Sequence, residues 1–171
     1  MTTISDRFRK WYAYEQNCNA QSLEMLASIP DEARSHTEFQ KAIDKMSHLV
    51  AARRRWLYRL GHFAESPSLF PKNVALADLP RLVAETESAW VEYLSHLTDA
   101  DLTRMFEWDT PDGKKLRWDV ESVLTQVFGH AWYHRGQIAQ YVARLGGKAV
   151  DTDYYFWCES KPLEVDASTE A

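Results

Sequence analysis

The chain has 171 residues, of which 45% are hydrophobic and 26% are charged, and only six glycines and six prolines interrupt it. This composition is typical of a globular, mainly helical protein and fits a single domain, residues 1–171. The formal net charge of −5 argues against a general nucleic-acid binder, which needs a basic face. No window approaches the roughly 18 apolar residues of a membrane span, and the N-terminus has no secretory signal. Because the two cysteines, Cys18 and Cys158, make no disulfide framework, we expect a cytoplasmic protein.

Two long helices are predicted in the first third of the chain, where apolar residues recur at spacings of three and four. The first covers about residues 4–29 and ends before Pro30. The second has Ser35 or Thr37 as its cap and ends at Gly61.

A crossover and a third helix follow. Residues 62–77 include Pro67 and Pro71 and break the periodicity, over a length that is too great for a tight turn. We expect this segment to cross the surface to a helix that Asp78 caps and that ends near His96.

The next elements are a hairpin and a fourth helix. Short apolar–polar alternations flank Asp112-Gly113 and predict two strands between residues 98 and 118. Asp119 caps the fourth helix, which runs to about Leu145. Four long amphipathic helices predict an all-α four-helix bundle, with the hairpin leaning on it.

The tail begins with an aromatic cluster at residues 151–157 and ends in a short acidic stretch, about residues 160–171, which we expect to be frayed. With seven Trp, eight Tyr and seven Phe, the chain has the side chains for a large core.

His130 and His134 stand four residues apart in the fourth helix, so both leave the same side of it. They are in register with apolar Val127 and Ile138 and therefore point into the bundle. Unpaired buried imidazoles are costly, and neutral imidazole is a common metal ligand, so the pair indicates half of a metal site. Ala131 stands where a zinc protease needs Glu, which excludes that motif. The alternative is two ordinary core histidines.

A third ligand must come from another helix. His36, His62 and His96 lie at helix ends or in loops and are expected to be surface or capping residues. His48 is in the middle of the second helix. The residues around it do not decide whether it is a partly exposed helix histidine or a ligand. Asp44, one turn earlier, is a candidate to hold the other ring nitrogen of His48, or else an ordinary salt-bridge partner.

A set of polar and apolar residues, in order along nearly the whole chain, carries a resemblance. The set comprises Tyr14, Asn19, His48-Leu49-Val50-Ala51-Ala52-Arg53, Trp56-Leu57, Gly129-His130, Tyr133-His134-Arg135-Gly136-Gln137-Ile138, Leu145-Gly146-Gly147 and Thr152-Asp153-Tyr154. In this combination the chain resembles the DinB family of small metal-dependent proteins, in the DinB/YfiT-like superfamily. It departs from the family at Asn17, where an aromatic residue is frequent, and this affects packing more than metal binding.

The resemblance implies an up-down-down-up bundle, a homodimer, and a divalent nickel, zinc or iron ion held by His48, His130 and His134. Three protein ligands leave open positions, which is the mark of a catalytic metal site. Relatives include thiol-dependent transferases and isomerases, so a low-molecular-weight thiol is a further expected cofactor. We therefore expect a metal-dependent hydrolase or thiol-dependent transferase. The alternatives are a non-catalytic metal-binding or stress-associated protein and a plain structural bundle.

Residues around the metal site are expected to support it. Tyr14, Asn19 and Tyr133 are candidate polar contacts, with core aromatic packing as the alternative for both tyrosines. Arg135 is expected to be a structural ion-pair partner, of Asp153 for example. The run Arg53-Arg54-Arg55 predicts a solvated face.

Overall fold

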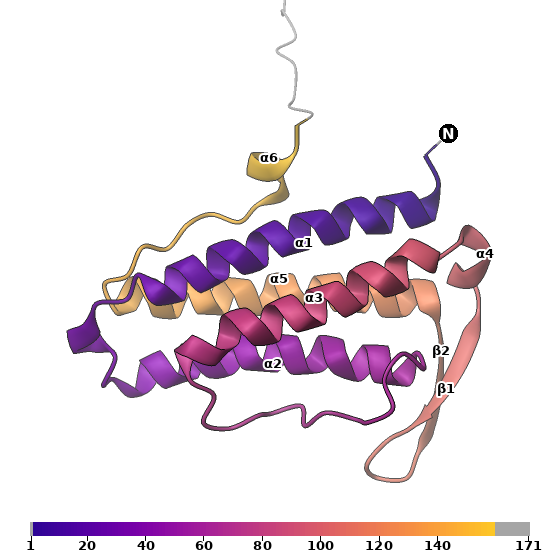
Figure 1. Cartoon of the computed structure of the whole chain (residues 1–171), viewed down its shortest axis with the longest axis horizontal. Helices are drawn as coiled ribbons and strands as arrows, with labels where there is room; N and C mark the ends of the chain where they lie inside the picture. The colour runs from indigo at the N-terminus through magenta and orange to yellow at the C-terminus, as the bar shows by residue number, and fades with distance from the viewer. Residues whose placement is uncertain (1, 160–171) are drawn as a thin grey trace, which may run out of the picture.

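The computed structural model describes residues 2–159, and four long helices form its bundle (Figure 1). They are α1 (Ile4–Ala27), α2 (Thr37–Arg59), α3 (Leu79–His96) and α5 (Val120–Arg144). The shorter elements are the 3₁₀ turns η1 (Asp31–Ala33) and η2 (Leu76–Asp78), helices α4 (Asp99–Leu102) and α6 (Tyr154–Trp157), and strands β1 (Met105–Asp109) and β2 (Lys115–Asp119). The acidic tail predicted to be frayed, residues 160–171, lies outside the described residues.

The helix order confirms the up-down-down-up arrangement. In Figure 1, α1 and α5 run in one direction and α2 and α3 in the other, because the long crossover after α2 returns the chain to the opposite end of the bundle. Each of α1 and α2 packs against both α3 and α5. The helices α2 and α5, which carry the predicted ligands, are therefore antiparallel neighbours.

The helix ends show which predicted caps form. The carboxylate of Asp119 accepts a hydrogen bond from the Ser122 amide at 2.7 Å and begins α5 as predicted. The predicted cap of α2 is wrong, because neither Ser35 nor Thr37 is in the cap position. Thr37 is the first helical residue of α2, with His36 before it in the cap position. Asp78 is in the cap position of α3 as predicted, but it has helical dihedral angles at the end of η2 and its side chain makes no capping hydrogen bond.

The predicted hairpin is confirmed. Strands β1 and β2 are antiparallel, with Phe106 opposite Trp118, and Gly113 in the turn has a φ of +80°. The hairpin leans on the end of α2, where the ring of Trp56 lies 5.4 Å from that of Trp108. This contact anchors a two-stranded sheet that would be marginal on its own.

The core is divided into two apolar clusters along the bundle axis. One cluster is built around Leu26, Ile43, Leu79 and Ile138, and the other around Phe8, Leu57, Trp90, Val123 and Phe128. Buried polar side chains from α1, α2 and α5 lie near the boundary between the two clusters; those that surround the site described below are Glu15, Asn19, Arg53, His134 and Arg135. We call this middle section the polar layer. None of the helices within residues 2–159 has the length and apolar character needed to cross a membrane.

Candidate metal centre

Three histidines meet at the polar layer, where α2 faces α5. The Nε2 atom of His130 lies 3.3 Å from Nε2 of His48 and 3.1 Å from Nε2 of His134. One ring nitrogen of each residue lies within 4.8 Å of those of the other two. His134 is buried and the other two are half-buried. This group, the histidine triad, brings together the two residues predicted from spacing and the one that the resemblance implied, in an arrangement that can hold a metal ion.

Hydrogen bonds orient two of the imidazoles. The Nδ1 atom of His48 lies 2.8 Å from the carbonyl oxygen of Leu69, and Nδ1 of His134 lies 2.8 Å from Oε1 of Gln137. Because a carbonyl oxygen only accepts, each Nδ1 carries the proton and donates. Each Nε2 then keeps its lone pair, directed at the centre of the triad. This is the tautomer that metal-binding histidines adopt when a partner holds the other ring nitrogen.

Two members of the triad, His130 and His134, are uncharged at neutral pH because their pKa values are lowered. Burial, with the neighbouring His134 and His48, lowers the pKa of His130 to about 4. Burial also lowers the pKa of His134, although the hydrogen bond to Gln137 opposes this shift. Neutral rings offer lone pairs to a cation without first losing a proton, so the donor set fits a divalent transition metal.

A buried ion-pair network supports the triad from the side of α1. Glu15 is fully buried and forms ion pairs with Arg53 of α2 and Arg135 of α5, the latter at 2.7 Å. Burial alone would lower the pKa of Arg135, but the Glu15 carboxylate outweighs it and raises that pKa. Because Arg135 directly follows His134, the network fixes the helices that carry the ligands relative to α1.

Two predicted contacts are wrong. Asp44 is exposed and accepts from Gln40 at 2.9 Å, while the Leu69 carbonyl occupies the His48 nitrogen that Asp44 was expected to hold. The ion-pair partner of Arg135 is Glu15 and not Asp153.

Arg53 does not lie on a solvated face, because it is only 4% exposed and binds Glu15. Neighbouring Arg54 does lie nearer the surface, 3.6 Å from Glu85.

Tyr14 and Asn19 belong to the buried network. Asn19 accepts from Arg53 at 3.0 Å and donates to Glu87 at 2.7 Å. Tyr14 is buried, donates to the carbonyl of Thr152, and lies 3.4 Å from a guanidinium nitrogen of Arg135. Within residues 2–159, no hydrogen bond joins Tyr14 or Asn19 to the triad.

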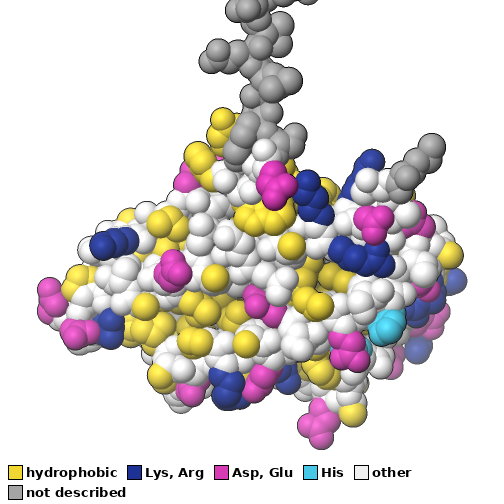
Figure 2. Space-filling model, turned by 45° about the horizontal axis from the view of Figure 1, so that its top comes forward, with side chains coloured by type: hydrophobic (Ala, Val, Ile, Leu, Met, Phe, Trp, Pro, Cys, Tyr) yellow, Lys and Arg dark blue, Asp and Glu magenta, His cyan; other side chains and the backbone are white. Residues whose placement is uncertain are grey.

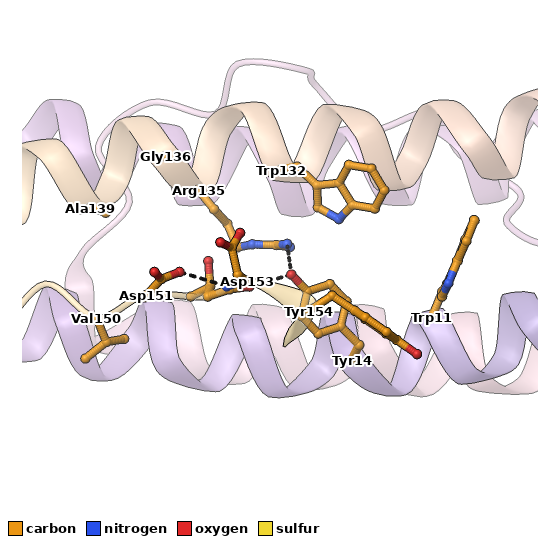
Figure 3. A pocket seen from close by; sticks show the side chains of 11 residues that line it. Trp11, Tyr14, Trp132, Arg135, Gly136, Ala139, Val150, Asp151, Asp153 and Tyr154 are labelled. Carbon is orange, nitrogen blue, oxygen red and sulfur yellow. Dashed lines mark hydrogen bonds between the residues drawn. The ribbon is translucent and has the colours of Figure 1, made fainter. Parts of the chain in front are cut away.

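Figure 3 shows Tyr14 and Arg135 meeting in the wall of a pocket of about 700 Å³, which lies between α1, α5 and residues 150–154. The α5 residues of this pocket, among them Trp132 and Arg135, are on the opposite helix face from His130 and His134. This pocket is therefore separate from the triad.

Tyr133 is 66% exposed, so the packing alternative for this residue is wrong. Its ring centre lies 5.1 Å from that of His134, at the edge of the triad. Phe70 of the crossover, which the sequence did not single out, stacks on His48 with the ring centres 4.8 Å apart.

Fold and site together define a class: a helical bundle in which two antiparallel helices present three converging imidazoles that could hold a metal ion. The comparisons with known proteins agree with it. The sequence profile of the DinB family matches residues 1–166, and the chain belongs to this family. Protein DinB of Bacillus subtilis (strain 168) is 26% identical over 164 residues, which cover 88% of this chain and 93% of that protein. Among solved structures, none gave a significant match.

Proposed function

We propose that the histidine triad binds a divalent nickel, zinc or iron ion and that the protein is a metal-dependent hydrolase or thiol-dependent transferase. The observation that carries the proposal is the convergence of three Nε2 atoms, two of them in tautomers fixed by Leu69 and Gln137. If His48 and His134 were only core residues, nothing would require their Nε2 lone pairs to point toward His130.

The open side of the triad favours catalysis over a purely structural metal. Three protein donors leave coordination positions free, and His48 and His130 line a pocket of about 150 Å³ where a small molecule would reach them. A metal ion bound there would polarise a substrate oxygen or lower the pKa of a water molecule or thiol. The chain's own contribution is to hold the imidazoles through Leu69 and Gln137 and to cover His48 with Phe70.

A screen of the metal-loaded protein with ester substrates, each with and without glutathione, bacillithiol or mycothiol, tests the catalytic part. Turnover without thiol supports the hydrolase, and turnover that requires a thiol supports the transferase. Either rate must be lost in His134→Ala, because that residue supplies one of the three donors. Full metal occupancy with no turnover of any substrate would favour the non-catalytic metal-binding alternative.

The expected homodimer is part of the same proposal. Figure 2 shows hydrophobic side chains at the surface near the C-terminal end of the described chain, and Tyr155 and Phe156 are 55% and 61% exposed. Exposed aromatic side chains on α5, such as Trp132, add apolar area of the kind that subunit interfaces cover. Sedimentation equilibrium should give twice the mass of the chain, whereas the mass of one chain would contradict the dimer.

A further inference from the structure

One face of α2 continues from the triad toward the C-terminal end of the helix. His48, Ala52, Arg55 and Arg59 follow one another at spacings of four, three and four residues, so they share this face. All four line the pocket of about 150 Å³ beside the triad; its other lining residues are Trp56, Leu69, Gln126 and His130. Because Ala52 has only a methyl group, the pocket extends from the histidines to the arginines without a large side chain between them.

Within the described residues 2–159, the contacts of the two arginines are to neutral groups. Arg55 donates to the carbonyl oxygen of Pro67 at 2.6 Å, and its Nε is buried without a hydrogen-bond acceptor. The guanidinium of Arg59 lies 4.6 Å from the ring centre of Trp56 and 5.0 Å from that of Trp108. Neither forms an ion pair with any acidic side chain in the described part of the chain.

Two half-buried cations one helical turn apart repel each other. Burial, and then the nearby Arg55, lower the pKa of Arg59. Glu107 and Asp109 line an adjoining outer cavity of about 500 Å³ that includes both arginines. Asp109 is paired with Lys115 at 3.4 Å, and no ion pair within the described residues joins Glu107 to either arginine. The positive charge beside the triad is therefore left to be neutralised by a molecule from solution.

We propose that Arg55 and Arg59 bind an anionic group, a carboxylate or a phosphate, on the molecule whose other end lies at the histidine triad. The inference rests on the proposed function, because it names the substrate class of that site. Guanidinium groups match the paired oxygens of both anions, and the flanking Trp56 and Trp108 hold Arg59 in position.

The spacing along α2 sets the size of this molecule. Seven residues separate His48 from Arg55, which is about 10 Å of helix. Arginine side chains lean toward the N-terminal end of their helix, and this shortens the distance between the guanidinium and the triad. His48 and Arg55 also hold carbonyls of the same crossover, those of Leu69 and Pro67, which are at most about 7 Å apart. The substrate is therefore a short molecule with a polar group at each end.

Calorimetric titration of the metal-loaded full-length protein with glutarate and with inorganic phosphate tests this assignment. At least one anion should bind, and Arg55→Gln or Arg59→Gln should weaken it by about 10-fold or more, because each loses a charge-assisted hydrogen bond. Arg54→Gln is the matched control, since Arg54 faces Glu85 and should leave the affinity unchanged. The anion that binds more tightly identifies the group as carboxylate or phosphate.

Two outcomes would overturn the assignment: neither anion binds the wild-type protein, or the Arg55→Gln and Arg59→Gln variants bind as tightly as it does. Circular dichroism and metal content must match the wild type in each variant. A measurement without substitution adds a check, since the NMR signal of the Arg55 Nε–H group should shift when the anion is added, and an unmoved signal counts against the assignment.

Failure of the proposed function gives a different result. If the triad holds no metal, the same titrations on the metal-free protein still report on Arg55 and Arg59, because their contacts do not involve the histidines. If metal binds but neither arginine affects anion affinity, the anion assignment fails and the metal site stands.

Discussion

Replacement of Glu15 by Gln should destabilise the fold strongly, although it changes one oxygen to an amide nitrogen. Glu15 is fully buried, and its two oxygens contact guanidinium groups of Arg53 and Arg135 and the indole N–H of Trp132, the last at 3.1 Å. The substitution leaves two positive charges buried with no negative partner. It also directs an amide donor at groups that only donate.

The magnitude follows from the burial of all three charges. Arg53 and Arg135 are 4% and 3% exposed, so water cannot replace the lost carboxylate. Removing one partner of a buried ion pair costs about 3–5 kcal/mol, which is a large part of a total unfolding free energy of roughly 5–15 kcal/mol. For a chain of this length each kcal/mol lowers Tm by about 2–4 °C, so the expected decrease is roughly 6–20 °C.

Urea unfolding followed by circular dichroism measures this loss. The matched control is Glu85→Gln, because the carboxylate of Glu85 pairs with Arg81 at 2.7 Å but its side chain is 46% exposed. The control should change the unfolding free energy by less than about 1 kcal/mol. If Glu15→Gln is no more destabilising than Glu85→Gln, the buried network does not hold the helices together.

Three further predictions concern the triad and the helix that carries it. Gln137→Leu should weaken metal binding by about 10–100-fold, measured by competition with a chromogenic chelator, because Nδ1 of His134 loses its acceptor; unchanged affinity would refute that role. Because the pKa of His130, about 4, lies below its ordinary value of 6.5, the unfolded chain binds the proton first. The unfolding free energy of the metal-free protein should therefore fall between about pH 6.5 and pH 4, and a flat profile in urea unfolding would contradict it. Asp119→Ala removes the acceptor of the Ser122 amide and should lower the unfolding free energy by about 1 kcal/mol, measured by the same method. An unchanged unfolding free energy would show that the cap does not stabilise α5.

Much of the fold could be predicted from local sequence signals. Apolar spacing of three and four predicted the four long helices, and Asp112-Gly113 predicted the hairpin turn, because each depends on residues close together in the chain. The cap predicted for α2 at Ser35 or Thr37 was wrong, because His36 takes the cap position. Asp78 takes its predicted cap position before α3, but without a capping hydrogen bond from its side chain. The helix order came from the family resemblance and not from spacing.

The sequence predicted those site residues whose spacing places them on the apolar face of a helix. Register with the apolar stripe placed His130 and His134 inward. Two features carried a readable signal that was missed: Glu15 and Arg53 each occupy a position of an apolar stripe, which places a charge in the core. The contact of His48 with the Leu69 carbonyl had no signal, because any loop residue supplies a backbone carbonyl.

The metal content of the protein, purified without chelator or nickel resin and then loaded with zinc, tests the central claim most directly. The wild-type chain should hold about one metal ion, because its three imidazoles converge on one point. His134→Ala should hold less than about a tenth of that amount with its helical circular dichroism intact, whereas His36→Ala, at an exposed position before α2, should match the wild type. Equal metal content in all three proteins, or none in the wild type, would contradict the claim that the histidine triad is a metal site.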